Sequence, residues 1–531
     1  MCLVDATEND RYVALSYVWG SVLTFQTKKA LVPALYARGG LQTVWEEIAR
    51  TVQDAVLVVR GLGERFLWTD AICIVQDDPV DKAELIKDMD TVYARATLTI
   101  VAAEGEHANS GLPGIHPNSR CAPETFNVGV DFSLLIAPAP VGGTLLHCPW
   151  SKRAWTFQEC VLSARQLVFT HSTVHFVCCS TTWSEDVRCV SEDTAPPWKW
   201  APGTMFDFRP SLSEVNKQLT SLAETVETAD TDDEEDIDPL FDLWVDVVGN
   251  LSMRKLSFEA DILFAAAGMI SVLEKIFRVR SIFGLPERRL EQFLFWSPME
   301  PGCLRRRRDI HGRALYPTWS WAGWIGEVSW PEHTARPHGS SVKGIEWLGL
   351  AEYGAQPVAL QAGGRGTVRD DALAATTSYD LKMNVQMDLP ILQFATRTAR
   401  LNISTTAPPP EWISELQSFA WTTVRPDSSA RRHGVYCITS LSDVCDVVGF
   451  VVLDSSDVIL NLDGLVTLFA IVSSVPYQQP QYEGSFGLVF HRVLALSQGG
   501  GGGICERIGH GAILVRKNDN IGWMDDTIIL G

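Results

Sequence analysis

Residues 67–79 have the sequence Leu67-Trp68-Thr69-Asp70-Ala71-Ile72-Cys73-Ile74-Val75-Gln76-Asp77-Asp78-Pro79, and the surrounding fold can be predicted outward from them. The first part, residues 67–74, is an apolar segment with a single carboxylate, Asp70. The turn Asp77-Asp78-Pro79 then supplies a helix N-cap and, through proline, a pre-set φ. The pattern predicts a strand near Leu67–Ile72 that leads into a helix.

A helix and a second strand are predicted after this turn. Between Asp81 and Ala96 apolar residues recur at steps of three and four, which is typical of an amphipathic helix. Thr97–Ala102 is a β-branched run bounded by Glu104-Gly105. A strand, a helix and a strand in this order form a βαβ unit, which implies that the two strands are parallel.

The same alternation extends towards the N-terminus. Residues 12–18 are predicted as a buried strand, and residues 41–59 show a helical apolar face that is ended by Gly61 and Gly63. An open, mostly parallel, doubly wound sheet begins in this way. Ligands of such sheets sit beyond the carboxyl ends of the strands, where Ser16–Gly20 and Asp70–Gln76 should meet.

The chain beyond this sheet is predicted in less detail. Residues 105–150 are rich in loop-forming residues and indicate an insertion. Trp155–Leu162 is predicted as a short helix, and residues 166–170 and 174–178 are predicted as strands. His171, His175 and Cys178 do not indicate a zinc site, because strand-forming neighbours surround them and no second ligand pair completes the set.

Three blocks of sequence resemble the fungal heterokaryon-incompatibility (HET) family. They are Tyr12-Val13-Ala14-Leu15-Ser16-Tyr17-Val18-Trp19-Gly20, then Trp68 to Asp78 with Lys82, Ile86, Met89 and Tyr93, and finally Arg153-Ala154-Trp155-Thr156-Phe157-Gln158-Glu159-Cys160-Val161-Leu162-Ser163-Ala164-Arg165. Their order and spacing are those of the family, although the family usually has Asn where this chain has Val75. The resemblance covers residues 3–190 best.

The resemblance implies a flavodoxin-like or Toll/interleukin-1 receptor (TIR)-like core, because the HET domain is a distant relative of TIR domains. Some TIR domains cleave NAD with one glutamate. By this resemblance Glu159 is the first catalytic candidate, while a helix-start carboxylate that binds backbone N–H groups remains its alternative. Asp70 is the second candidate, because it follows a predicted strand at the carboxyl edge of the sheet, and a buried structural hydrogen bond to the neighbouring loop is its alternative. The candidate ligand-binding residues are Ser16, Trp19, Gly20, Gln76 and Trp155.

Two molecular hypotheses follow for a family that acts in non-self recognition and programmed cell death. In the first, the core is an NAD glycohydrolase switched on by self-association, with NAD as substrate and no bound cofactor. In the second, the core is a non-catalytic death-signalling module that acts through self-association or protein partners.

Four parts of the chain are expected from composition. Residues 1–190 form the HET domain, and residues 191–240 form an acidic linker that we expect to be disordered. Residues 241–334 are predicted as a helical segment that ends in a tryptophan-rich stretch. Residues 335–531 contain short apolar runs separated by turn residues, which predict a β-rich C-terminal domain.

Charge and cysteine content limit the class of protein. A net charge of −20 disfavours nucleic acid as a partner, because phosphate binding needs a basic face. The run Arg305-Arg306-Arg307-Arg308 is expected to be a solvated loop or a set of ion-pair partners. Twelve cysteines without a CxxC pair indicate reduced thiols rather than a disulfide framework. No signal peptide and no apolar stretch long enough for a membrane span are visible, so a cytoplasmic protein is expected.

Overall fold

Two compact units make up the chain. The computed structural model describes residues 1–7, 9–120, 125–127, 133–135, 144–145, 147–178, 182–185, 238–287, 290–300, 302–330, 342–343, 345–351, 391–404, 435–439, 447–455, 466–476, 488–498, 504–516, 521 and 523–530. The first unit consists of Met1–Asp232, Arg254–Ser257 and Phe264–Val272, and the second consists of Asp233–Met253, Phe258–Leu263 and Leu273–Gly531. The predicted acidic linker lies mostly outside the described residues.

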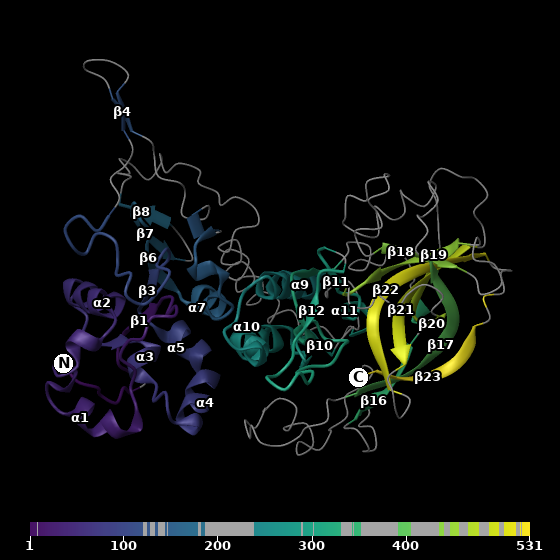
Figure 1. Ribbon diagram of the computed structural model, residues 1–531, viewed down its shortest axis with the longest axis horizontal. Helices are drawn as coiled ribbons and strands as arrows, with labels where there is room; N and C mark the ends of the chain where they lie inside the picture. Colours follow the sequence, from purple (N-terminus) through teal and green to yellow (C-terminus); the bar gives the residue numbers. More distant parts are fainter. Residues whose placement is uncertain are drawn as a thin grey trace, which may run out of the picture. The chain divides into compact units, whose positions relative to one another are not determined.

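A six-stranded sheet organises the first unit (Figure 1). In spatial order its strands are β2 (Leu67–Trp68), β1 (Val13–Ser16), β3 (Leu98–Ala102), β6 (Arg165–Phe169), β7 (Val174–Cys178) and β8 (Thr182–Ser184). The first four are parallel, and β7 and β8 extend the sheet in antiparallel pairings. The predicted parallel pairing of the first three strands is therefore confirmed. A separate two-stranded hairpin, β4 (Thr125–Asn127) with β5 (Ser133–Leu135), lies in the predicted insertion.

The described helices of the first unit agree with the prediction except for α1, which was not predicted, and for differences that concern the bounds of two helices and one strand. They are α1 (Val32–Tyr36), α2 (Arg50–Gly61), α3 (Asp70–Cys73), α4 (Pro79–Lys87), α5 (Met89–Arg95) and α7 (Trp155–Leu162), with 3-10 turns at Lys29–Leu31, Gly40–Gln42, Trp45–Glu47 and Trp150–Lys152. Asp78 caps α4 as predicted, since its side chain accepts a hydrogen bond from the Val80 N–H. Helix α7 has the predicted bounds.

The three differences have local causes. The predicted helix over residues 41–59 begins only at Arg50, because the segment before it bonds elsewhere: Leu41 N donates to Met1 O, and Phe25 N donates to Glu47 O. The predicted helix over residues 81–96 is two helices that break at Asp88. The predicted strand Leu67–Ile72 ends at Trp68, because Cys73 N donates to Thr69 O and starts α3.

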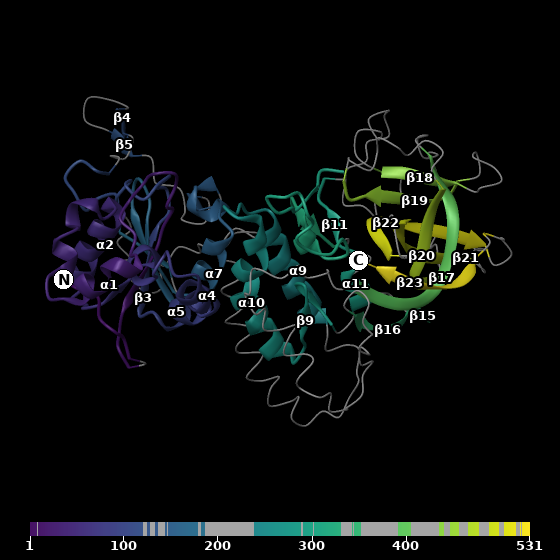
Figure 2. The same cartoon turned by 60° about the horizontal axis from the view of Figure 1, so that its bottom comes forward.

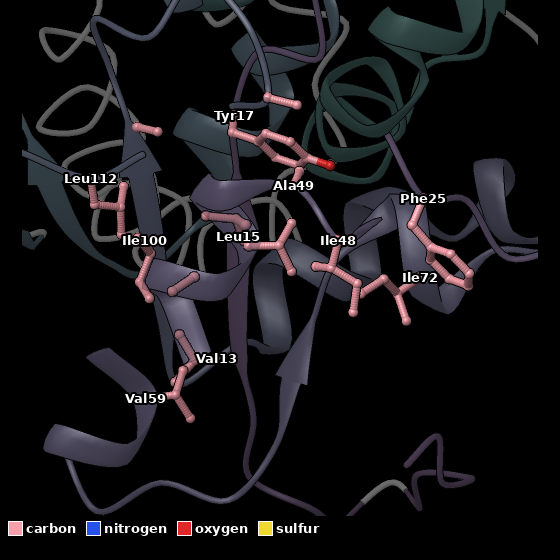
Figure 3. Close-up of a cluster of buried hydrophobic side chains, with 14 of the residues drawn as sticks. Val13, Leu15, Tyr17, Phe25, Ile48, Ala49, Val59, Ile72, Ile100 and Leu112 are labelled. Atoms are coloured by element: carbon pink, nitrogen blue, oxygen red, sulfur yellow. The ribbon is translucent and has the colours of Figure 1, made fainter. Parts of the chain in front are cut away.

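Helices cover both faces of this sheet. Val13 and Leu15 point towards α2 and pack with Val52, Ala55 and Val59 in one buried cluster. Figure 3 shows Val13, Leu15 and Ile100 from the strands in this cluster, with Val59 from α2. The alternate residues of β1 face the other side, where Ala14 packs with Met89 and Tyr93 of α5. Ser16 shares that second face, because side chains alternate along a strand.

The second unit begins with helices and a tryptophan-rich segment. Its elements here are α9 (Asp238–Ser252), α11 (Leu290–Phe293), 3-10 turns at Glu259–Asp261 and Trp321–Gly323, and the strand pairs β9 (Ser281–Ile282) with β10 (Leu285–Pro286), β11 (Ser297–Pro298) with β14 (Val328–Ser329), and β12 (Arg305–Arg306) with β13 (Trp324–Ile325). Helix α10 (Ile262–Phe277) is divided between the units, with Phe264–Val272 in the first unit and its two ends in the second. The expected helical segment thus also contains short antiparallel pairs. Of the helices that the structure describes, none combines the length and the apolar character that crossing a membrane requires.

The run of four arginines is only partly a solvated, ion-paired loop. Arg305 is exposed and pairs with Glu259 at 2.9 Å, as expected. Arg307 is buried and donates to Trp324 O, while Arg306 donates to the main-chain oxygens of Tyr316 and Gly323. These two side chains therefore hold the tryptophan-rich segment together, and the expectation of a solvated loop is wrong for them.

A nine-stranded sheet ends the second unit (Figure 2). Its strands are β15 (Val342–Lys343), β16 (Ile345–Ala351), β17 (Ile391–Ser404), β18 (Val435–Thr439), β19 (Val447–Leu453), β20 (Val466–Pro476), β21 (Leu488–Gln498), β22 (Ile504–Arg516) and β23 (Met524–Leu530). The pairing returns on itself, because β17 bonds both to β18 and to β20. The predicted β-rich region is confirmed.

Candidate functional site

The candidate site lies at the carboxyl ends of the parallel strands in the first unit. From β1 the chain first adds β2 on one side of the sheet and then β3 on the other, so the strand order reverses at β1. Ligands of open parallel sheets bind outside the strand ends at such a reversal. Ser16 is the last residue of β1, and Asp70 comes two residues after the end of β2. Both therefore lie at this edge, as predicted.

A buried hydrogen-bond chain joins three side chains there. The Trp150 indole Nε1 donates to Ser16 Oγ at 2.6 Å, and Ser16 Oγ donates to Glu159 Oε2. An indole N–H can only donate, so the serine oxygen must accept from Trp150 and the serine proton must point to the carboxylate. All three side chains are buried. The serine thus orients Glu159 and favours its ionised form.

Glu159 lies within α7 and not at its start. It is the fifth residue of that helix and bonds side chains instead of first-turn N–H groups, so the helix-start interpretation is wrong. Burial raises its pKa to about 7; the Ser16 hydrogen bond lowers it, the charge of Asp70 raises it, and Arg153 and Tyr93 lower it. The carboxyl group is therefore poised to change protonation near neutral pH.

Asp70 is the second carboxylate of the site. It begins α3, where its Oδ1 accepts the Ala71 N–H at 2.8 Å, and it is partly exposed. Burial raises its pKa to about 6, and the nearby Trp19 indole, the Ala71 N–H and the charge of Arg153 each oppose that rise. The Trp19 indole nitrogen lies near the Asp70 carboxyl, but the two groups do not meet the geometric criteria of a hydrogen bond.

Two buried tyrosines complete the surroundings. The Tyr93 hydroxyl donates to Leu15 O at 3.2 Å and also interacts with the Glu159 carboxyl. Burial and then the charges of Glu159 and Asp70 hold the pKa of Tyr93 well above its ordinary value. Burial and then Asp70 do the same for the pKa of Tyr17. Both phenols therefore stay protonated and neutral beside the carboxylates.

The remaining predicted binding residues have other surroundings. The Gln76 side-chain amide donates to Asp70 O at 3.0 Å and shapes the loop after α3. Gly20 has φ +66°, and an added Cβ would lie 2.5 Å from His107 Cβ, so its absence of a side chain allows a close approach of two loops. Trp155 opens α7 and is partly exposed. Within the described ranges no hydrogen bond links Gly20 or Trp155 to the two carboxylates.

A segment distant in sequence supports the turn before α7. Arg254 is buried, lies over the Phe157 ring at 4.8 Å, and donates to Ser151 O and Arg153 O. Ala154 N donates to Lys255 O at 2.9 Å, and Lys255 N donates to Lys152 O at 2.6 Å. Residues 254–255 thus fix the backbone that carries Trp150 and Arg153 to the site.

Close packing of α10 also supports α7. An added Cβ at Gly268 would lie 2.5 Å from Asp90 Cβ and 2.9 Å from Gln158 Oε1. Only glycine therefore allows this part of α10 to approach α5 and α7 so closely. Sequence analysis did not single out Trp150, Arg254 or Gly268 for the site, because each acts through a contact across a long stretch of chain.

The assembled site contains two carboxylates, and the positive charge of Arg153 acts on both of them. The two carboxylates can stabilise a developing positive charge and, with pKa values near neutrality, can accept or donate a proton. Across the part of the chain that the structure describes, no three His, Cys, Asp or Glu side chains are placed to hold a metal ion.

Comparison with known proteins agrees with this location. Residues 12–159 match the family model described as heterokaryon incompatibility protein (HET). The match begins just before β1 and ends at Glu159, so it spans Ser16, Asp70 and Glu159. Searches of curated proteins and of solved structures found no match.

Proposed function

Because residues 12–159 match the HET family model, we propose that the chain acts in the cytoplasm of a fungal cell in non-self recognition and regulated cell death, and that its core cleaves NAD. The parallel strands follow the order 2-1-3-4 of flavodoxin-like sheets, which supports a distant relation to TIR domains. One observation carries the enzymatic part: Glu159 is buried at a strand end and oriented by Ser16, next to a second carboxylate.

The proposed role of Glu159 is electrostatic stabilisation of the transition state. In NAD hydrolysis the bond between ribose C1′ and the nicotinamide nitrogen breaks, and nicotinamide leaves with the electron pair. The ribose then carries an oxocarbenium-like positive charge until water adds to C1′ and loses a proton. An ionised Glu159 would stabilise that charge, and Asp70 would bind the ribose hydroxyls or take the proton from water.

The surroundings of Glu159 suit this role. A buried carboxylate faces little water, so its charge acts strongly on a nearby cation. Trp150 and Ser16 fix the carboxylate before substrate arrives, so little reorganisation is needed. With a Glu159 pKa of about 7, the ionised fraction, and hence turnover, should rise between pH 6 and pH 8.

The test measures nicotinamide release by the concentrated full chain with NAD. Glu159→Gln keeps the shape but removes the charge, so we expect turnover to fall about a hundredfold, the loss of about 3 kcal/mol of transition-state stabilisation typical of one such partner. Glu64→Gln is the matched control, because Glu64 belongs to a surface ion pair with Arg11 in the same unit.

Cell death provides the second readout. When the chain is overexpressed in a fungal host, death should follow turnover across these variants. If Glu159→Gln kills as efficiently as the parent while cellular NAD stays intact, the core is a non-catalytic module that signals through self-association or partners, and the enzymatic proposal is wrong.

A further inference from the structure

Three basic residues on and beside the turn before α7 have side chains with no assigned role. Lys152 ends the 3-10 turn that carries Trp150, Arg153 follows it, and Lys255 pairs with this backbone from the other side. We call these three residues the basic corner. Lys152 and Lys255 are exposed and Arg153 is partly exposed. Within the described ranges none of the three forms an ion pair or a side-chain hydrogen bond, in a chain whose net charge is −20.

Arg153 stands beside the two carboxylates without pairing with either. Its positive charge lowers the pKa of Tyr17, of Asp70 and of Glu159. Its backbone is fixed from three directions: its N–H donates to Trp150 O at 3.2 Å, its oxygen accepts Thr156 Oγ1 at 2.8 Å, and residue 255 bridges it. The backbone of Arg153 is thus fixed while its guanidinium is unpaired among the described residues, which leaves this side chain available to an anionic ligand.

The arrangement of charges at the site suits a substrate that carries positive charge at one end and negative charge at the other. In NAD the nicotinamide ring is cationic and the diphosphate is anionic. Glu159 and Asp70 suit the cationic ring and its ribose, but they would repel the phosphates. The basic corner offers the positive charge that the carboxylates lack, directly before the helix that carries Glu159.

We propose that the basic corner, with Arg153 at its centre, is the subsite that binds the diphosphate of the nucleotide substrate. The identity of the ligand rests on the proposed NAD cleavage. The subsite itself requires only a nucleotide that carries phosphate. Arginine binds phosphate with two parallel N–H bonds, while lysine acts as a point charge, so the three residues should contribute unequally.

The first test compares substrates that differ in phosphate content. Kinetics are measured at pH 9, where Glu159 should be ionised with or without the charge of Arg153. For Arg153→Gln we expect the KM for NAD to rise about ten- to hundredfold, as for the loss of a hydrogen bond to a charged group, with kcat changed less than about threefold. The KM for nicotinamide riboside, which has no phosphate, should not change. Lys255→Gln should give a smaller rise, and Arg38→Gln is the control, because Arg38 is an exposed arginine after α1.

The second test does not depend on turnover. Calorimetric titration of the full chain with ADP-ribose should show binding that weakens at least tenfold in Arg153→Gln, with a smaller dependence on salt. If the parent binds ADP-ribose through Arg153 but releases no nicotinamide, hydrolysis is wrong and the subsite stands. If nicotinamide is released but Arg153→Gln and Lys255→Gln bind ADP-ribose like the parent, the subsite is wrong and hydrolysis stands. Failure of the parent to bind ADP-ribose would also overturn the subsite.

Discussion

Each unit buries a carboxylate, and the two are satisfied in different ways. In the second unit Asp454 and Arg507 are fully buried, with Nε to Oδ2 at 2.9 Å and a second bond at 3.0 Å. The same guanidinium donates to Leu294 O and Trp296 O and stacks 3.6 Å from the Trp296 ring. In the first unit Glu159 has no ion pair among the described residues, and its nearest acidic neighbour repels it.

This difference separates a structural charge from one that is costly to maintain. The Arg507 guanidinium contacts an anion, carbonyl oxygens and an aromatic face, so these interactions offset the free-energy cost of removing its charge from water. Glu159 receives neutral hydrogen bonds only, so its ionised form remains expensive. Groups of the second kind are concentrated at functional sites, where stability is given up for chemistry.

The largest effect should come from breaking the compensated pair. Asp454→Asn leaves the Arg507 charge buried without an anion, so we expect the second unit to lose about 3–5 kcal/mol of unfolding free energy. Chemical denaturation followed by tryptophan fluorescence would measure this, because Trp296 lies against the guanidinium. The double variant Asp454→Leu with Arg507→Met should recover much of the loss. A loss below about 1 kcal/mol for Asp454→Asn would show that the pair is not compensated as described.

A smaller effect, of opposite sign, is expected at Glu159. Between its ordinary value and a folded pKa of about 7, the folded state keeps a proton that the unfolded state has released. The free energy of unfolding therefore falls as pH rises through this window. Glu159→Gln cannot ionise, so at pH 8 the variant should be more stable than the parent by about 1–3 kcal/mol, with little difference at pH 5.

Calorimetric melting at both pH values would check the Glu159 prediction. Equal melting temperatures at pH 8 would mean that ionised Glu159 is fully compensated, and the contrast with Asp454 would disappear.

The smallest effect concerns the hydroxyl between Trp150 and Glu159. Ser16→Ala leaves the Trp150 N–H without its acceptor, which should cost about 1–2 kcal/mol of stability, and it removes a bond that lowers the Glu159 pKa. The pH profile of nicotinamide release should therefore move to higher pH. Thr99→Val is the control, because Thr99 Oγ1 bonds Ser163 Oγ at 2.7 Å and not a carboxylate. A shift of the profile in both variants would contradict a specific role for Ser16.

Local pattern was enough to predict the sheet and part of the site. The β-branched and apolar runs predicted the parallel strands, and the strand ends then placed Ser16 and Asp70 at one edge. The pattern of apolar residues could not show that residues 41–48 lie outside the helix, because their hydrogen bonds to Met1 and Phe25 are tertiary contacts. For the same reason it missed Trp150, which lies in a loop-rich stretch and reaches Ser16 across the fold.

The order in which the first unit is completed during synthesis follows from its connectivity. Glu159 leaves the ribosome long before Gly268, although the part of α10 around Gly268 packs on the helix that carries Glu159. Because synthesis proceeds at about 5–20 residues per second, several seconds pass between the emergence of α7 and the emergence of the part of α10 that packs on it. During that time the apolar side of α7 is available to chaperones or to other nascent chains. We therefore expect the yield of active protein to depend on the rate of synthesis between the two segments.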